Sequence, residues 1–398
     1  MDIALFKDEV IELRIRPEKD IAQLSDDDIN EKYLKGEVRI ITEQARYPLD
    51  TIKTMLDSKK YKLDPEFQRR HRWTQGQKSR LIESFIMNVP IPPIFLYEVS
   101  YSNYEVMDGL QRLTAIYDFY NDKYELKELE YWKELEGRKY STLPEQVKSG
   151  IDRRYLSSII LLKETAKTKD AEKQLKQIVF ERINSGGTKL EYQESRNALY
   201  SGKFNELCIK LARNTYFCKI FGIPEPTEEE IMHNVISEDL EENNMYSKMR
   251  DVEAVMRFFA MRHVDKYNGR QKEYFDLFTE SANKLPDTVL ASYASLFEKT
   301  IELAYNLFGE SAFGNWREKE EGWIFNPYPN LYIYDPIMVV LSKYADQPDQ
   351  LLSKKNAINA NRKQLFLNNA ILTDGRQTSK SAIEQRMEVI NDFFNSFL

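Results

Sequence analysis

The sequence predicts an α+β protein, with a mixed α/β part first and a mostly helical part after it. Glycine and proline number only 14 each among 398 residues, which disfavours an all-β chain and favours long helices. Between residues 94 and 120, two short apolar runs, a glycine corner and a helical pattern follow one another, which is the order of a compact α/β unit. From residue 191 onward, apolar residues recur at helical spacing almost without interruption.

The elements of the mixed part are set by apolar periodicity and by glycine and proline. Pro90, Pro92 and Pro93 forbid a helix, so the apolar run after them is expected to be a strand. Gly109 is expected to end the next strand and to open a helix whose inward face carries Leu113, Ile116, Tyr117 and Tyr120. The expected helices are 48–60, 78–89, 111–120 and 171–184, and the expected strands are 94–99, 104–107 and 157–164.

The length exceeds that of one ordinary domain, so several domains are expected. The predicted division is a charged N-terminal extension at 1–45, a mixed α/β domain at 46–200 and a helical domain at 201–398. No apolar run reaches 18 residues, and the N-terminus lacks a signal-peptide core. We therefore expect a cytoplasmic protein that does not associate with membranes.

The formal net charge of −7 argues against an attraction of the whole surface to DNA. The charge is distributed unevenly, however. Residues 59–80 carry eight Lys or Arg and two acids, a balance of +6, and residues 225–242 carry eight acids and no Lys or Arg. We interpret the acidic run as a solvated loop or helix face, while the basic run can serve a nucleotide or DNA.

The segment YEVMDGLQRL places Asp108 and Gly109 between an expected strand and an expected helix. Free amides at a helix start bind anions, and glycine lets a ligand approach the backbone closely. Arg112 can grip a phosphate, and Asp108 can bind Mg²⁺ or orient a water. Taken alone, the motif favours a structural interpretation, in which Asp108 caps the helix and Arg112 pairs with a surface acid.

A second segment gathers polar and basic side chains around Trp73. Basic residues interleaved with an aromatic suit a polyphosphate, a nucleobase or a nucleic-acid backbone. The alternative is a charged loop that Trp73 anchors to the core. The side chains concerned are those of Gln68, Arg69, Arg70, Arg72 and Lys78.

A third segment, around Gly186 and Gly187, follows a helical pattern. A glycine there can end the helix, or the loop can be a second phosphate or metal loop. The lysine of a Walker A motif is absent, so the segment is not a P-loop. The polar groups that the loop offers come from Arg182, Asn184 and Thr188.

Together and in this order, these segments resemble the ParB/sulfiredoxin-like family that carries an Asp-Gly-Gln-Gln-Arg motif. It includes the N-terminal, GmrS-type half of GmrSD modification-dependent restriction enzymes and the phosphorothioation-dependent SspE-type defence proteins. The resemblance covers roughly residues 40–398. The matching segments are Asp64-Pro65, Phe67-Gln68-Arg69, Trp73, LIESFIMNVPIPPIFL, MDGLQRLTAIYDF, FERINSGGTKL, ESRNALYSG, MRDVEAVMRFFAMR and SAIEQRMEVINDFF.

The resemblance implies a ParB-like N-terminal domain that binds and often hydrolyses a nucleoside triphosphate (NTP), in defence against phage or modified foreign DNA. With Mg²⁺ as the expected cofactor, the catalytic residues would be Asp108, Gln111 and Arg112, and Asp108 would hold the metal. DNA and a separate nuclease or effector protein are expected as further partners. The expected nucleotide contacts are Gln68, Arg69, Arg72, Trp73, Gly109, Arg112, Asn184, Gly186, Gly187 and Thr188.

Two departures from the family pattern shape the hypothesis. Leu110 replaces the first glutamine of the motif, so any role of that amide is missing. We also expect no appended His-Asn-His nuclease domain, because the chain has only three scattered histidines. The leading hypothesis is an NTP-hydrolysing sensor or regulator in defence. A non-hydrolysing nucleotide- or DNA-binding module that recruits an effector and a DNA-nicking nuclease stay open as alternatives.

Overall fold

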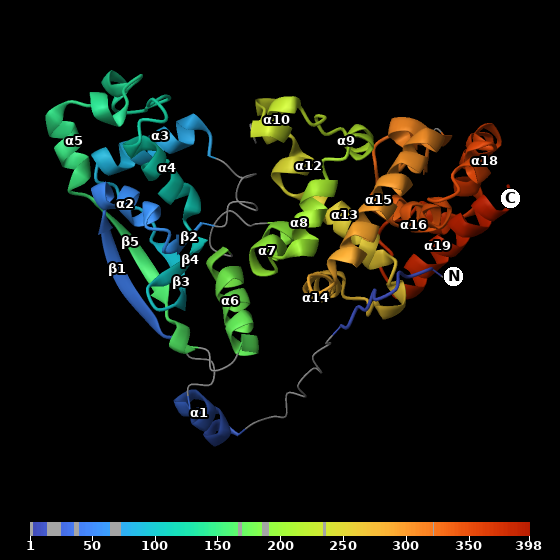
Figure 1. Ribbon diagram of the computed structural model, residues 1–398, viewed down its shortest axis with the longest axis horizontal. Helices are drawn as coiled ribbons and strands as arrows, with labels where there is room; N and C mark the ends of the chain where they lie inside the picture. The colour runs from blue at the N-terminus through green and yellow to red at the C-terminus, as the bar shows by residue number, and fades with distance from the viewer. Residues whose placement is uncertain are drawn as a thin grey trace. The chain divides into compact units, whose positions relative to one another are not determined.

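The computed structural model describes residues 3–13, 25–35, 40–63, 73–165, 169–184, 191–233, 236–320 and 322–398 (Figure 1). The chain divides into two compact units. One unit is Glu18–Leu190, and the other joins Met1–Pro17 to Glu191–Leu398. The first unit holds a mixed sheet with helices and the second is mostly helical, so the predicted α+β class is confirmed. The sequence patterns place the domain changes after residues 45 and 200, whereas these units change at 17 and 190.

The sheet unit contains the strand–corner–helix succession that the sequence predicts, together with two strands that it does not. The unpredicted strands are β1 and β2, which carry mainly polar or half-buried side chains. The elements are α1 (Asp26–Lys35), β1 (Thr42–Pro48), α2 (Ile52–Asp57), β2 (Tyr61–Lys62), α3 (Gln75–Ile86), β3 (Ile94–Ser100), β4 (Asn103–Asp108), α4 (Leu110–Tyr120), α5 (Glu145–Asp152), β5 (Tyr155–Leu161) and α6 (Lys169–Asn184).

The five strands form one mixed sheet in the order β1-β5-β3-β4-β2. Strand β3 is parallel to β5 and antiparallel to β4. Helices α2, α3 and α4 pack on one face, where Leu96 of β3 and Leu113 of α4 are fully buried in a shared core. On the other face, Lys176 of α6 pairs with Glu105 of β4 at 3.0 Å and lies 4.2 Å from the centre of the Tyr97 ring. The sheet is therefore covered by helices on both faces (Figure 1).

The sheet curves so strongly that side chains of its two edge strands, β1 and β2, come into contact. Tyr47 of β1 and Tyr61 of β2 lie on opposite edges, yet their hydroxyl oxygens are 3.4 Å apart. The Tyr61 ring also stacks on Tyr104 of β4, with centroids 5.1 Å apart. Burial and the neighbouring phenol of Tyr47 raise the pKa of Tyr61 far above its ordinary value. The Tyr61 phenol therefore stays neutral and packs between the two edge strands.

A buried carboxylate of α3 organises the long connection after α4. Glu83 is 2% exposed and accepts hydrogen bonds from the successive amides of Glu130, Tyr131 and Trp132, at 3.2, 2.8 and 2.9 Å. Burial opposes ionisation of this carboxyl, but the three amide donors prevail and hold the pKa of Glu83 below its ordinary value. The Tyr131 side chain is 71% exposed, although Glu83 holds the backbone of its loop in place.

The helical unit packs around α13 and α15, and aromatic rings fill its core. Phe259 of α13 stacks on Tyr293 of α15 with centroids 4.4 Å apart, and Phe204 of α8 meets both rings edge-on. The elements are α7 (Tyr192–Leu199), α8 (Lys203–Leu211), α9 (Thr215–Phe221), α10 (Glu228–His233), α11 (Glu238–Glu242), α12 (Asn244–Ser247), α13 (Arg250–Met261), α14 (Gln271–Ala282), α15 (Asp287–Phe308), β6 (Asn315–Lys319), β7 (Gly322–Asn326), α16 (Leu331–Leu341), α17 (Asp349–Leu352), α18 (Lys355–Asn368) and α19 (Lys380–Asn395).

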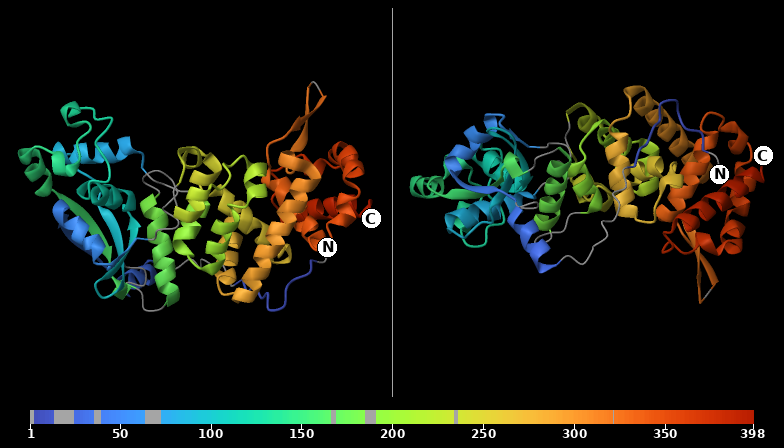
Figure 2. Two further views of the ribbon diagram at one scale, coloured as in Figure 1. Left: turned by 45° about the horizontal axis from the view of Figure 1, so that its top comes forward. Right: turned by 90° about the horizontal axis from the view of Figure 1, so that it is seen from below.

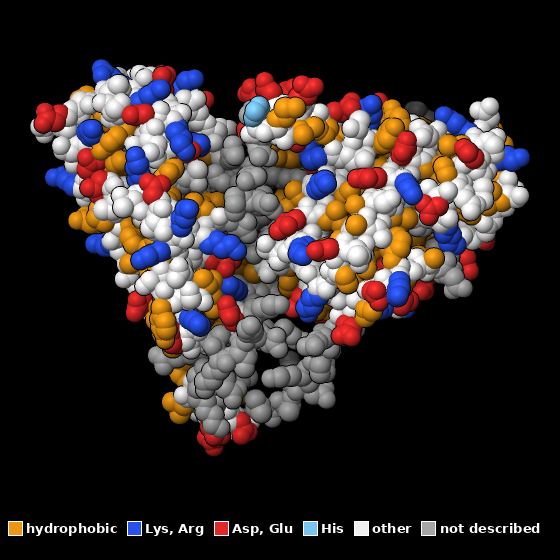
Figure 3. Space-filling view, viewed as in Figure 1, with side chains coloured by type: hydrophobic (Ala, Val, Ile, Leu, Met, Phe, Trp, Pro, Cys, Tyr) orange, Lys and Arg blue, Asp and Glu red, His pale blue; other side chains and the backbone are white. Residues whose placement is uncertain are grey.

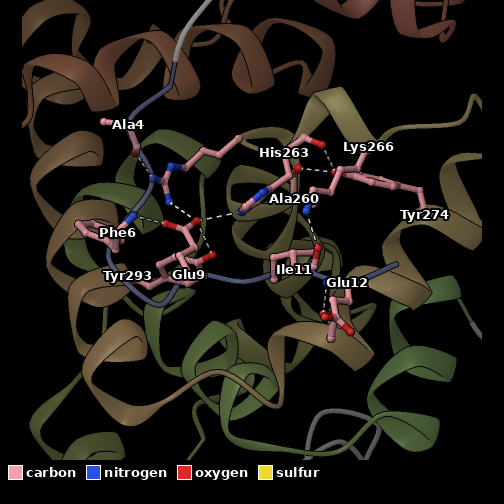
Figure 4. A network of polar contacts seen from close by, with 12 residues as sticks. Ala4, Phe6, Glu9, Ile11, Glu12, Ala260, His263, Lys266, Tyr274 and Tyr293 are labelled. Atoms are coloured by element: carbon pink, nitrogen blue, oxygen red, sulfur yellow. Dashed lines mark hydrogen bonds and ion pairs between the residues drawn. The ribbon is translucent and has the colours of Figure 1, made fainter. Parts of the chain in front are cut away.

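The first residues of the chain are built into this helical core. Glu9 accepts hydrogen bonds through one carboxylate oxygen from Arg262 Nη1 (3.1 Å), His263 Nε2 (2.9 Å) and the Tyr293 hydroxyl (2.7 Å), as Figure 4 shows. Its other oxygen accepts from the Phe6 amide at 2.7 Å. Residues 3–13 therefore form part of the helical unit, although the sequence suggests only a charged extension there.

The hairpin β6–β7 is the one two-stranded sheet in the described ranges, and the sequence reading did not predict it. Its strands pair antiparallel, with Trp316 opposite Phe325 and Arg317 opposite Ile324. Both views of Figure 2 show it in orange, projecting from the helices. Charged residues in β6 hide the apolar alternation of a strand, so the sequence does not predict a strand there.

The acidic run at 225–242 is largely solvated, as its composition suggests. Glu228 and Glu229 of α10 are exposed, and Glu230 pairs with Arg213 at 2.6 Å. Ile231 and Met232 of the same helix are 72% and 71% exposed, and Figure 3 shows acidic and apolar side chains side by side there.

None of the helices in the described ranges combines the length and the apolar character that crossing a membrane requires.

Candidate functional site

The corner between β4 and α4 is built around a glycine in a left-handed conformation. Gly109 has φ +95° and forms the N-cap of α4, with no side-chain cap. Asp108 is the last residue of β4, so it does not cap the helix, which was the structural alternative. A Cβ on Gly109 would lie 2.4 Å from Cγ2 of Ile94. Glycine is therefore required here by its backbone conformation and by the close approach of β3.

Arg112 binds back onto the corner from the first turn of α4. Its Nη2 donates to Asp108 Oδ2 at 2.6 Å. Its Nη1 donates to the carbonyl oxygens of Pro92 and Pro93, the latter at 3.2 Å. The side chain is 12% exposed. Both terminal nitrogens are thus engaged in holding the proline turn before β3 against the strand–helix corner.

Asp108 carries the partly exposed carboxylate of the β4–α4 corner. Its side chain is 35% exposed, and Oδ2 is bound by Arg112. Within the described part of the chain, Oδ1 accepts no hydrogen bond. The first amides of α4 begin two residues further on, at Leu110, and such amides have no partner inside their own helix. The corner therefore offers one carboxylate oxygen and a set of helix-start amides.

The described ranges hold no group of three or more His, Cys, Asp or Glu side chains that could bind a metal by themselves. A metal at Asp108 would therefore need other ligands, such as phosphate oxygens and water. Mg²⁺ at nucleotide sites is commonly held in this way, by one or two carboxylates together with phosphates. Asp108 thus fits a metal that arrives with a nucleotide.

Gln111 links the corner to the second predicted segment. Its Oε1 accepts a hydrogen bond from the Trp73 backbone amide at 3.1 Å. Trp73 itself is half-buried against the core of the sheet unit. Gln111 therefore fixes the point at which the chain leaves the 64–72 segment and enters α3. The sequence reading assigned Gln111 to the reaction and did not anticipate this contact.

Leu110 lies inside the core. It is 8% exposed and belongs to the cluster beneath the sheet, with Leu113 and Ile116. The position at which the resemblance leads us to expect an amide therefore carries a packing group in this chain. Its side chain has no polar atom to offer a ligand.

Several predicted site residues lie outside the described ranges. In the second segment these are Gln68, Arg69 and Arg72, and in the third they are Gly186, Gly187 and Thr188. Asn184 is the last residue of α6, and only its backbone is described. The structure thus brings together Trp73, Asp108, Gly109, Gln111 and Arg112.

The contribution of the proline turn escaped the sequence reading. The sequence identifies Pro92 and Pro93 only as helix breakers, whereas in the structure their carbonyl oxygens accept hydrogen bonds from Arg112. It predicts Ile94 only as a strand residue, whereas in the structure this side chain fills the space beside Gly109. The sequence does indicate that the prolines lie near the corner. They come directly before β3, and the corner comes directly after β4. Because β3 and β4 are antiparallel neighbours, the start of β3 lies beside the end of β4.

Comparison with family models connects this corner to known proteins. The model described as GmrSD restriction endonuclease, N-terminal domain, matches residues 52–201. This range includes the corner, the proline turn and α3 to α6. Comparisons with curated proteins and with solved structures gave no match for the chain. Residues 52–201 are therefore similar to the N-terminal domain of GmrSD restriction endonucleases.

Proposed function

We propose that the 52–201 domain binds a nucleoside triphosphate at the β4–α4 corner, and that nucleotide occupancy regulates a response to modified or foreign DNA. The observation that carries the proposal is the partly exposed Asp108 carboxylate beside the first amides of α4. A helix start attracts phosphate through its amides and its dipole, and a carboxylate beside it suits the accompanying cation. The family match supports DNA as the final target.

Asp108 is the proposed metal ligand. Arg112 holds one of its oxygens at 2.6 Å, which leaves Oδ1 to face a cation. Bound Mg²⁺ would neutralise the negative charge of the phosphates. Arg112 contributes by orienting the carboxylate and by placing a positive charge 2.6 Å from it, close to where the phosphates would lie. Gln111 contributes by holding the backbone of Trp73, the residue that follows the basic segment in the sequence.

Hydrolysis is the leading outcome of binding, and binding without turnover is the second candidate. The second candidate is favoured by Leu110, whose buried side chain cannot orient a water or a phosphate. It is also favoured by Arg112, whose terminal nitrogens already hold Asp108 and the proline turn. In that case the bound nucleotide changes the conformation of the protein without being hydrolysed, and a separate effector protein acts on the DNA.

The test compares two aspartates, Asp108 at the end of β4 and Asp118 within α4. Asp108→Asn removes the proposed metal ligand, whereas Asp118→Asn is the matched control. Asp118 also pairs with a cation, Lys78 at 3.2 Å, but it lies roughly 15 Å further along the axis of α4. Binding of the four NTPs to the full chain is measured by calorimetry with MgCl₂, and phosphate release is measured separately.

We expect the wild type and Asp118→Asn to bind at least one NTP, and Asp108→Asn to bind it about tenfold more weakly or worse, a loss of about 1.4 kcal/mol. Equal affinities of Asp108→Asn and wild type would refute the site. Phosphate release that depends on Asp108 would support NTP hydrolysis. Nucleotide binding without phosphate release would support a binding module that does not hydrolyse the nucleotide. A plasmid-nicking assay with Mg²⁺ or Mn²⁺ tests the third alternative, a DNA-nicking nuclease. Adding modified or unmodified DNA to the phosphate-release assay tests whether modified DNA is the target.

A further inference from the structure

Three lysines that the proposed nucleotide site does not use lie at the turn from α2 into the short strand β2. Lys59, Lys60 and Lys62 are all exposed, and within the described ranges none of them pairs with a carboxylate. Other lysines of the same unit are paired, Lys78 with Asp118 at 3.2 Å and one of α6 with β4 at 3.0 Å. The turn therefore presents three positive charges that have no counter-charge in contact.

Two acids beside this turn already have partners. Asp57, the last residue of α2, accepts a hydrogen bond from the Tyr117 hydroxyl at 2.8 Å. Glu105 lies opposite Lys62 in the parallel pair β2–β4 and is paired with a lysine of α6. Lys123 adds a further cation, because its Nζ lies 4.9 Å from the centre of the Tyr117 ring. This edge of the sheet is therefore positively charged, although the whole chain carries −7.

Lys59 occupies a backbone position at which glycine is the usual residue. Its φ is +58°, in the left-handed region, and it follows Ser58, the C-cap of α2. Helices commonly end on a glycine in this conformation, because a Cβ is strained there. The turn is also fixed at both ends, since the Lys59 amide donates to the Leu56 carbonyl at 3.3 Å and the Lys60 carbonyl accepts from the Tyr104 amide at 2.8 Å. A lysine in place of the usual glycine is best explained by a use for its side chain.

We propose that Lys59, Lys60 and Lys62 contact the phosphate backbone of duplex DNA, without regard to base sequence. This inference rests on the proposed function, which takes DNA as the target. Each DNA strand carries one negative charge about every 3.4 Å along the helix axis, so neighbouring phosphates can meet all three lysines at once. Lysines on an edge strand can instead serve only to prevent pairing with another strand, and the test separates the two roles.

The test variant replaces Lys59, Lys60 and Lys62 by glutamine in the full-length protein. The matched control makes the same change at three exposed lysines of the helical unit, so both variants lose the same charge. The control positions are Lys354, Lys355 and Lys363. Fluorescence anisotropy with a labelled DNA duplex gives the affinity of each protein between about 50 and 200 mM KCl. Circular dichroism checks folding, sedimentation velocity checks self-association, and calorimetry measures NTP binding.

We expect wild type and control to bind the duplex alike, and the test variant to bind it about tenfold more weakly or worse at about 100 mM salt. The slope of log affinity against log salt should become shallower by about 0.9 for each lost contact, roughly 2.7 for all three. The proposal is overturned if the wild type does not bind the duplex, or if test variant and control bind it equally. Unchanged DNA binding with new self-association of the test variant would assign the lysines to protection of the sheet edge.

Lys59→Gly separates the role of the charge from that of the fold. It relieves the left-handed strain, so its melting temperature should equal or exceed that of the wild type. Its DNA affinity should nevertheless fall, with a salt slope shallower by about 0.9. A more stable variant that binds DNA as tightly as the wild type would remove Lys59 from the surface.

The nucleotide measurements keep this inference apart from the proposed function. The glutamine variant of the three lysines should bind NTP as the wild type does, because these lysines lie outside the β4–α4 corner. If Asp108→Asn leaves NTP binding unchanged, the nucleotide site fails while the lysine-dependent salt slope still stands. If Asp108→Asn loses NTP binding but the lysine variants keep full DNA affinity, only the DNA surface fails.

Discussion

Glu9 Oε1 lies 3.1 Å from Arg262 Nη1, and both side chains are almost completely buried, at 0% and 1% exposed. Further hydrogen bonds offset part of the cost of withdrawing an ion pair from water, although among the described residues the buried Nε of Arg262 has no hydrogen-bond partner. His263 and Tyr293 satisfy the same carboxylate oxygen, and Arg262 Nη2 donates to the Ala4 carbonyl at 2.8 Å. The contact therefore ties the beginning of the chain to the centre of the helical unit.

Replacing Glu9 by alanine is expected to lower the free energy of unfolding by about 3–5 kcal/mol, because Arg262 is left buried without its counter-charge. Urea denaturation followed by tryptophan fluorescence measures the loss. Glu12→Ala is the control, since the Glu12 side chain is exposed and only its backbone amide is bonded, to Ser281 at 2.9 Å. Equal denaturation midpoints for the two variants would contradict the role of the pair.

The same carboxylate predicts a pH dependence. Burial opposes its ionisation, but the His263 hydrogen bond and the Arg262 charge hold the pKa of Glu9 below its ordinary 4.5. A lowered folded-state pKa contributes stability above the unfolded-state value, and this contribution is lost as pH falls through the folded-state value. The stability difference between wild type and Glu9→Gln should thus be full near pH 7 and shrink below about pH 4.5. A difference that stays constant down to pH 3 would count against this reasoning.

Glu83→Ala is expected to loosen the connection after α4. Three successive amides lose one acceptor, and each buried donor left unsatisfied costs about 1–3 kcal/mol. Hydrogen exchange should accelerate at Glu130, Tyr131 and Trp132 before the rest of the unit. Glu128→Ala, whose side chain is 70% exposed, is the control and should leave these amides protected.

Gly109→Ala and Gly137→Ala separate backbone strain from steric conflict. Both glycines have positive φ, +95° and +75°, and a left-handed alanine costs roughly 1–2 kcal/mol. Only at Gly109 does the new Cβ meet another side chain, Cγ2 of Ile94 at 2.4 Å. Thermal unfolding should therefore show the larger loss for Gly109→Ala, and only that variant should also weaken NTP binding. Equal losses at the two positions would mean that β3 yields to the added methyl group.

The buried pair between α13 and α16 offers a double-mutant test. Arg257 Nε donates to Asp335 Oδ1 at 3.1 Å, with the side chains 8% and 6% exposed. Either Arg257→Met or Asp335→Leu alone is expected to cost about 3–5 kcal/mol, because one charge remains buried. The double variant should regain most of this loss. If it is instead as unstable as the sum of the singles, the pair contributes through shape and not through charge.

The corner was predictable because its signals are local. The strands β3 and β4 are apolar runs, and Gly109 separates the last strand residue from a regular helical pattern. Leu113 and Ile116 were expected to face inward, and both are fully buried. Tyr117 and Tyr120 are only half-buried, because their hydroxyls reach Asp57 and Asp152, at 2.8 and 2.9 Å.

The features that sequence reasoning missed depend on distant partners or on exposed edges. Strand β1 is an edge strand with mainly exposed residues, so it lacks the apolar alternation of a core strand. Glu9 finds its partners more than 250 residues away, and nothing near it in the sequence signals a buried carboxylate. The roles of the 64–72 and 185–190 segments in the nucleotide site stay predictions, because those residues lie outside the described ranges.

The contact between Glu9 and Tyr293 spans 284 positions of the chain. A ribosome that adds about 5–20 residues per second would need roughly 15–60 s between making the first residue and making the second. During that interval the sheet unit, Glu18–Leu190, is complete and can fold, while the opening segment has no partner. The helical unit is therefore the last part of the chain to reach its native state during synthesis, and its N-terminal residues are exposed to proteases until then.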